Sequence, residues 1–291
     1  MFFEYEEPVY RPPSEASSLI IQATIGCSWN RCTFCGMYKG KNFRVRSMEE
    51  ILSDINEASS MYTGVDRVFL ADGNALCLPT AQLLEIMAAV KKAFPGCSCI
   101  SLYASPGDIL EKTPEELDEL AAAGLKIIYL GIESGSPDVL KRTRKGASPD
   151  QIRDAGQRVV QSPVKLSVTL VSGLGGLELW EEHATCSARL LNEIQPDYLS
   201  LLTLMLVPGT VLYRQQEAGE FQPLSPAEIL AETRLFISQL ELKDCLFRSN
   251  HASNYVPIGG TLPGDRDHIL EILDLALEGG VKLRPDFQRR L

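Results

Sequence analysis

The sequence predicts an α/β fold, a partial (β/α)6 TIM-like barrel followed by a helical C-terminal extension. Two observations favour this fold: short apolar segments alternate with helical segments from about residue 18 to about residue 217, and no linker or repeat interrupts them. Such alternation is typical of parallel strands joined by crossover helices. A length of 291 residues is enough for one large core. A doubly wound sheet is the alternative arrangement of the same elements.

Six segments are predicted to form the strands, because each is short and mostly apolar, as strands covered on both faces tend to be. These segments are Leu19–Thr24, Arg67–Ala71, Ser98–Tyr103, Lys126–Gly131, Lys165–Val171 and Tyr198–Leu204.

Capping boxes predict where four helices begin. In this pattern a Ser or Thr side chain and a Glu or Gln three residues later satisfy backbone N–H groups that the first helical turn leaves without partners. The pairs are Ser47 with Glu50, Thr113 with Glu116, Ser148 with Gln151, and Ser225 with Glu228. Gly124 is predicted to end the helix that starts after Thr113.

The chain after residue 224 is predicted to be helical over 225–243 and 266–277, with an irregular segment over 247–265. The expected organisation is therefore an N-terminal arm (1–17), a core barrel (18–224) and a C-terminal helical extension (225–291) that covers the barrel.

The formal charge of -10 and the pI near 5.0 argue against a broad phosphate-binding surface, although the basic residues between 141 and 145 could form a local groove. Nucleic acid is therefore disfavoured as a partner. The N-terminus is acidic where a secretory signal would be basic, and no run of about 20 apolar residues occurs. We expect a cytoplasmic protein with no membrane association and with its eight cysteines reduced.

Cys27, Cys32 and Cys35 place three thiols within nine residues, directly after the first predicted strand. Thiolates select zinc, copper(I) or iron–sulfur clusters, and a structural zinc site normally has four ligands. Three thiolates would leave one iron of a four-iron cluster open to a substrate or cosubstrate. The alternative is a loop of three unligated or zinc-bound cysteines.

This loop resembles that of the radical S-adenosylmethionine superfamily, in which the usual spacing is C-x3-C-x2-C with an aromatic residue before the third cysteine. Phe34 occupies the aromatic position, whereas the first gap holds four residues here, as in outlying branches of the superfamily. The resemblance implies a [4Fe–4S] cluster on Cys27, Cys32 and Cys35, S-adenosylmethionine as cosubstrate on the fourth iron, and an oxygen-sensitive enzyme.

Three segments at predicted strand ends match positions where this superfamily binds S-adenosylmethionine, although each alone would be an ordinary turn. They are ADGNA (71–75), LGIESGS (130–136) and VSGLGG (171–176). The resemblance implies that Asp72, Gly73 and Asn74 hold the methionine amino group, that Glu133 and Ser134 contact the ribose and carboxylate, and that Val171, Ser172 and Gly173 contact adenine.

A fourth segment, LMLVPGT (204–210), is similar to the branch that contains anaerobic coproporphyrinogen dehydrogenases, magnesium-protoporphyrin cyclases and Elongator-type catalytic subunits. It could pack against adenine or belong to the core.

No catalytic residue is identified, but four residues are candidates. Cys77 could face the cavity as a hydrogen donor or ligand, or be a buried small residue. Asn250, His251 and Asn254 lie in a polar segment that could plug the mouth of the barrel and contact substrate. His183, beside Glu181 and Glu182, is expected on a solvated helix face.

The resemblance implies reductive cleavage of S-adenosylmethionine to methionine and a 5'-deoxyadenosyl radical, which takes a hydrogen atom from the substrate. We expect a small-molecule substrate and an electron donor such as flavodoxin or ferredoxin. Two alternatives are an RNA-modifying member of the same superfamily and a non-catalytic iron–sulfur electron-transfer protein.

Overall fold

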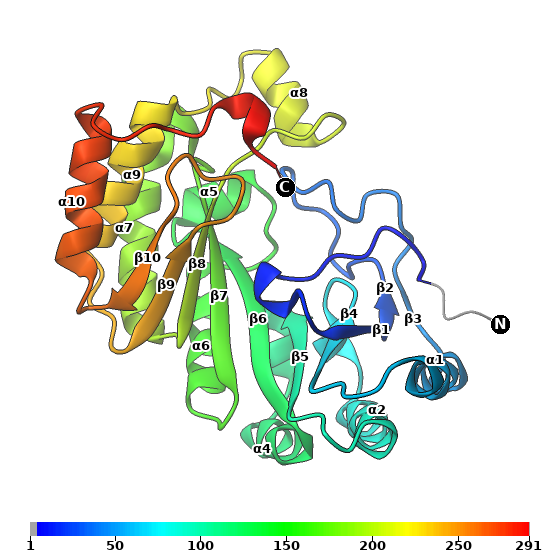
Figure 1. Ribbon diagram of the computed structural model, residues 1–291. Coiled ribbons are helices and arrows are strands. Elements are labelled where there is room, and N and C mark those ends of the chain that lie inside the picture. The colour runs from blue at the N-terminus through cyan, green and yellow to red at the C-terminus, as the bar shows by residue number, and fades with distance from the viewer. Residues whose placement is uncertain (1–4, 291) are drawn as a thin grey trace. The chain divides into compact units, whose positions relative to one another are not determined.

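The computed structural model describes residues 5–290 and confirms the α/β fold class, with a main sheet that is mostly parallel (Figure 1). Residues 1–4 of the predicted arm lie outside the described residues. Eight strands belong to the main sheet: β1 (Leu19–Gln22), β4 (Arg67–Ala71), β5 (Cys99–Ala104), β6 (Leu125–Glu133), β7 (Lys165–Ser172), β8 (Tyr198–Thr203), β9 (Cys245–Ser249) and β10 (Ile258–Leu262). A separate antiparallel pair consists of β2 (Thr24–Ile25) and β3 (Arg44–Val45).

The α-helices of the described chain are α1 (Met48–Met61), α2 (Thr80–Ala93), α3 (Pro106–Glu111), α4 (Pro114–Ala123), α5 (Pro137–Arg142), α6 (Pro149–Val160), α7 (Gly176–Ile194), α8 (Val211–Glu217), α9 (Pro226–Ser238) and α10 (Arg266–Leu277). Three short 3-10 turns are η1 (Pro13–Glu15), η2 (Ala75–Cys77) and η3 (Asp286–Gln288).

The chain forms two compact units. The first unit contains the residues up to 30, together with 37–130 and 158–166. The second unit contains 31–36, 131–157 and the residues from 167 onward. The predicted boundaries at residues 17 and 224 remain predictions.

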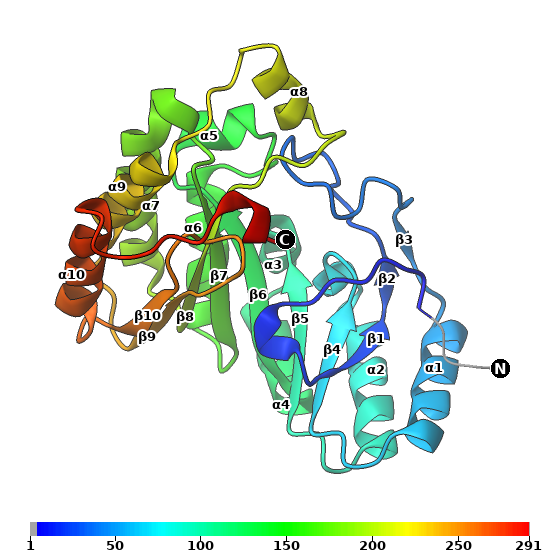
Figure 2. The ribbon, with the colours of Figure 1, turned by 45° about the horizontal axis from the view of Figure 1, so that its top comes forward.

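In the first unit the strands are ordered β1-β4-β5-β6 and all run parallel. Neighbouring residues of a strand point to opposite faces of the sheet, so Ile21 and Leu70 pack on one face while Phe69, Tyr103 and Tyr129 form an aromatic cluster on the other. Figure 2 shows α1 and α2 side by side next to β1 and β4. Burial on both faces explains why these strands are apolar throughout.

The segment before β1 is anchored in the first unit by Glu15, whose side chain is fully buried. Its carboxylate accepts hydrogen bonds from Arg67 and from the Tyr129 hydroxyl, both at 2.7 Å, and a further one from the Ser18 hydroxyl. A buried carboxylate is stable only when it is paired and hydrogen-bonded, as this one is. The residues around η1 are therefore part of the folded core of this unit.

In the second unit the order is β7-β8-β9-β10, with β10 antiparallel to β9 and the others parallel. The helix α9 lies between α7 and α10 (Figure 1). The prediction that 247–265 is irregular was wrong over β10 and the second half of β9. Because Gly259 and Gly260 have no side chains, the sequence of β10 lacks the apolar pattern of a strand. Its antiparallel pairing with β9 stabilises it.

The four predicted capping boxes are all confirmed by the hydrogen bonds of their side chains. Gly124 has a φ of 122° and ends α4, as predicted, with its N–H donated to Leu120. A fifth box, Ser105 with Asp108 at the start of α3, was not predicted. The helix α9 ends at Ser238, several residues before the predicted end.

Candidate active site

The cluster loop, residues 26–36, joins β2 to the chain before β3 and carries Cys27, Cys32 and Cys35. All three are half-buried, and no disulfide involves any of the eight cysteines. Within residues 5–290, no three His, Cys, Asp or Glu side chains are grouped as ligands of a single metal ion. Three thiols within nine residues nevertheless form a donor set that suits an iron–sulfur cluster, because soft thiolates are the usual ligands of such clusters.

Cys27 belongs to the first unit, where the start of the cluster loop is bonded to residues 72–74 at the end of β4. Ser28 N–H donates to Asn74 Oδ1 at 3.0 Å, and Gly73 N–H donates to the Gly26 carbonyl at 3.0 Å. A Cβ atom at Gly73 would lie 2.8 Å from Cα of Cys27, closer than atoms can pack. Only glycine at position 73 therefore lets Cys27 lie where it does.

Asp72 is fully buried beside the same loop. Its Oδ2 accepts hydrogen bonds from Gly26 N–H at 3.0 Å and from the Lys41 ammonium at 2.9 Å. Its Oδ1 is buried with no partner among the described residues. These bonds use one Asp72 oxygen to hold the loop. The predicted contact of residues 72–74 with a methionine amino group remains a prediction.

Cys77 lies in η2, a few residues beyond this contact, and is half-buried. Burial, assisted by the nearby Asp108 carboxylate, raises the pKa of the Cys77 thiol to about 12. The side chain is therefore a protonated thiol at neutral pH, which suits hydrogen donation better than metal ligation.

Cys32 and Cys35 belong to the second unit, and the backbone between them is bonded to two helix ends. Thr33 N–H donates to Thr143 at the end of α5, and Thr33 C=O accepts from Leu212 in the first turn of α8, both at 2.9 Å. Phe34 packs against an apolar cluster that contains Val171. The structure thus brings two of the predicted cofactor-binding residues, Phe34 and Val171, into one apolar surface.

Glu133 is the last residue of β6 and has a φ of 64°, a conformation that few residues other than glycine adopt. Its Oε1 lies 2.9 Å from the ammonium of Lys145. A Cβ atom at Gly131 would lie 2.3 Å from that same oxygen. The absence of a side chain at Gly131 therefore makes room for the Glu133–Lys145 pair.

His183 links the turns that follow β6 and β7. Its Nδ1 lies 2.7 Å from the Ser134 hydroxyl, and its Nε2 lies 3.1 Å from the Val171 carbonyl. Because a carbonyl can only accept, Nε2 carries the proton and Nδ1 accepts from Ser134. Burial lowers the pKa of His183 to about 4, so the ring is neutral at pH 7.

The prediction that His183 lies on a solvated face was wrong, because the side chain is buried. Glu181 is exposed, but His183 points to the opposite side of α7 with Ser187 and Leu191, which are spaced four residues apart. That spacing was the sequence signal that could have identified it.

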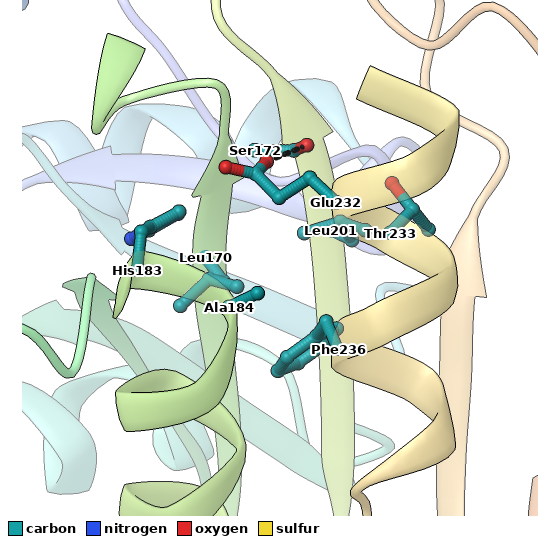
Figure 3. Close-up of a pocket in the computed structure, with 8 residues that line it drawn as sticks. All are labelled: Leu170, Ser172, His183, Ala184, Leu201, Glu232, Thr233 and Phe236. Carbon is teal, nitrogen blue, oxygen red and sulfur yellow. Dashed lines mark hydrogen bonds between the residues drawn. The ribbon is translucent and has the colours of Figure 1, made fainter. Parts of the chain in front are cut away.

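Glu232 of α9 points toward Ser172, in the turn after β7 (Figure 3). One of its oxygens, Oε2, accepts hydrogen bonds from Gly173 N–H at 2.6 Å and from the Ser172 hydroxyl. Burial raises the pKa of Glu232 to about 7. Glu232 and His183 both line a cavity of about 10 Å³, which is otherwise walled by side chains such as Leu170 and Phe236. Sequence reasoning missed Glu232.

The candidates in the polar segment differ in their surroundings. Asn254 is buried, and its side chain amide donates to Leu201 C=O and accepts from the Thr203 hydroxyl, both at 2.8 Å. His251 is half-buried with Nδ1 2.9 Å from the Ser253 hydroxyl, while Asn250 is exposed. The Asn254 side chain is thus committed to the end of β8, and contact of any of these residues with substrate remains a prediction.

Parallel strands with polar and glycine-rich turns at their carboxyl ends, together with a loop of three cysteines, define the class as barrel-type enzymes that carry a metal cofactor. The Radical SAM superfamily model matches residues 21–185, more than half of the chain. The chain belongs to the Radical SAM superfamily, whose members are enzymes that use a [4Fe–4S] cluster and S-adenosylmethionine.

Three similar proteins illustrate this relationship. The chain is 27% identical over 219 residues to a probable GTP 3',8-cyclase of Thermococcus kodakarensis, covering 73% of this chain and 64% of that protein. It is 24% identical over 135 residues to a tRNA uridine(34) acetyltransferase of Methanocaldococcus infernus, covering 46% and 25%. The structure of coproporphyrinogen III oxidase from Escherichia coli matches with a TM-score of 0.58 at 20% identity, covering 76% and 52%. The chain therefore spans less than two thirds of the length of each.

Proposed function

We propose that this chain cleaves S-adenosylmethionine reductively and uses the product radical to take hydrogen from a small-molecule substrate. Cys27, Cys32 and Cys35 would hold a [4Fe–4S] cluster, and S-adenosylmethionine would chelate the iron that they leave open. When bound, the cluster supplies the electron that breaks a carbon–sulfur bond and releases methionine and a 5'-deoxyadenosyl radical.

The observation that carries the proposal is the position of the three motifs relative to the strands. The strand β4 ends at Ala71, β6 at Glu133 and β7 at Ser172, so each motif spans the carboxyl end of a parallel strand. Ligands of α/β folds bind at these ends. A protein that only transferred electrons would not need three ligand-binding motifs at its strand ends.

Each motif residue has a proposed part in binding the cosubstrate. Residues 72–74 fix Cys27 and would hold the methionine amino group, and Glu133 and Ser134 would contact its carboxylate and the ribose. Phe34 and residues 171–173 would lie against adenine. The remaining task of the chain is to exclude water and oxygen from the substrate carbon.

A small-molecule substrate agrees with the charge of -10 and with the names of two similar proteins, which mention GTP and coproporphyrinogen III. Another similar protein is named for tRNA, so an RNA substrate is the second candidate. Filter binding of tRNA at increasing salt separates the two, because phosphate contacts give a steep loss of affinity with salt.

We further propose an electron donor such as flavodoxin or ferredoxin and a cytoplasmic location, where thiols stay reduced. No helix within residues 5–290 is long and apolar enough to cross a membrane.

Anaerobic reconstitution with iron and sulfide, followed by S-adenosylmethionine and a strong reductant, tests the proposal. The expected result is a brown protein that forms 5'-deoxyadenosine, with both properties lost in Cys27→Ala, Cys32→Ala and Cys35→Ala. Cys77→Ala and Cys186→Ala, which remove half-buried thiols outside the loop, should keep the brown chromophore. A fully loaded cluster without 5'-deoxyadenosine would overturn the proposal in favour of electron transfer.

A further inference from the structure

Side chains from two different helices form hydrogen bonds to the segment Val171–Gly173. His183 of α7 donates to the Val171 carbonyl, and Glu232 of α9 accepts from the Ser172 hydroxyl and from Gly173 N–H. Gly173 has a φ of 82°, and a Cβ atom there would lie 2.7 Å from the side chain of Ile229, one turn before Glu232. The turn therefore packs directly against α9.

Burying a carboxyl group at this position costs free energy, because the group loses its contacts with water. Glu232 is 2% exposed and belongs to a stripe of α9 with Ile229 and Phe236, where apolar side chains are usual. Its Oε1 has no hydrogen-bond partner among the described residues, so the group does not complete a closed polar network. What a leucine could not do is accept the two bonds from Ser172 and Gly173.

We propose that Glu232 is a positioning residue for cosubstrate binding, which fixes the turn 172–173 in the shape that receives the adenosine part of S-adenosylmethionine. This inference rests on the proposed function. Glu232 acts through the turn and does not itself touch the ligand.

The first experiment measures the affinity of the reconstituted protein for S-adenosylhomocysteine, which cannot be cleaved, by calorimetry. Glu232→Leu should weaken binding tenfold or more, and Glu232→Gln, which keeps an accepting oxygen, should restore it to within about threefold of the wild type. Thr233→Val is the matched control. Thr233 lines the same cavity from the same helix, but its hydroxyl bonds to Ile229 C=O rather than to the turn.

Kinetics add a second measurement. In Glu232→Leu the KM for S-adenosylmethionine should rise while kcat at saturation and the iron content stay close to those of the wild type. A fall in kcat with an unchanged KM would overturn the inference.

A third measurement covers the case in which Glu232→Leu does not fold. Within residues 5–290, the titratable side chains that line this cavity are Glu232 and His183, and His183, with its low pKa, stays neutral above pH 6. Bonds to an ionised carboxylate are stronger, so wild-type affinity should rise from pH 6 to pH 8 relative to Glu232→Gln. Identical pH profiles for the two proteins would contradict the inference.

The outcomes separate the two proposals. A wild type that fails to bind S-adenosylhomocysteine overturns both the proposed function and this inference. A wild type that binds, together with a folded Glu232→Leu variant of equal affinity, overturns the inference alone.

Discussion

Lys41 and Asp72 form an ion pair that is almost completely shielded from water. The ammonium lies 2.9 Å from Oδ2, and the two side chains are 5% and 0% exposed. The same Asp72 oxygen accepts from Gly26 N–H next to Cys27. The pair therefore balances a buried charge at the point where the cluster loop begins.

Replacing Lys41 by Met should lower the free energy of unfolding by about 3 to 5 kcal/mol, because it leaves the Asp72 carboxylate buried without its cation. Denaturant unfolding measures the change, and iron content after reconstitution should fall as well. Arg142→Ala, which breaks the exposed pair with Glu178, is the control and should change stability little. A Lys41→Met variant as stable as this control would contradict the assignment.

Gly73→Ala should abolish cluster loading while the protein remains folded. The added Cβ atom would collide with the backbone of Cys27, which must then move away from its position. Iron and sulfide analysis and circular dichroism measure the two properties. At Gly40 a Cβ atom would meet no heavy atom within 4 Å, so Gly40→Ala should load normally. Full loading of both variants would show that the position of Cys27 is not restricted in this way.

The stability of the protein should respond to pH with opposite slopes when Glu232 and His183 are replaced one at a time. The pKa of Glu232 is raised from 4.5 to about 7, so its contribution to the free energy of unfolding falls by about 3 kcal/mol as pH rises through that range. The pKa of His183 is lowered from 6.5 to about 4, so its contribution rises by a similar amount. In the wild type the two contributions offset each other.

Denaturant unfolding between pH 5 and pH 8 measures these slopes. Relative to the wild type, Glu232→Gln should gain stability with rising pH, and His183→Gln should lose it. Thr233→Val, a neutral change in the same cavity, should run parallel to the wild type. Parallel curves for all four proteins would mean that neither group changes its pKa on folding.

Cys77 should resist alkylation by iodoacetamide at pH 8. Only the thiolate reacts, and a pKa raised from 9.0 to about 12 lowers the thiolate fraction roughly a thousandfold. Peptide mass spectrometry of the folded protein and of the protein in guanidinium measures the rates. Equal rates in the two conditions would show that the folded protein does not protect this thiol.

Four helix starts and six strands were predictable from sequence, because caps and short apolar runs are local features. The caps at Ser47 and Thr113 satisfy backbone N–H groups regardless of the rest of the fold. The strand β10 was not predictable, because IGGTL has little strand propensity and its backbone depends on pairing with β9.

The candidate site was predictable as motifs but not as contacts. The cysteine spacing and the strand-end turns are visible in the sequence, whereas Glu232 lies about 60 residues from the turn that it holds. Its spacing from Ile229 and Phe236 places it on the apolar face of α9, and that unusual placement was the one available signal. The bond of Lys41 to Asp72 spans 31 residues and likewise required the three-dimensional structure.

Five hydrogen-bonding groups of the turn after β7 already have partners within the chain. The carbonyl groups of Val171, Ser172 and Gly173 accept from His183, Leu204 N–H and Gly176 N–H, respectively. The Ser172 hydroxyl and Gly173 N–H are both donated to Glu232. A ring that lies against this turn would be selected by its thickness and flatness, and the pattern of donors and acceptors along its edge would have to be recognised elsewhere in the protein.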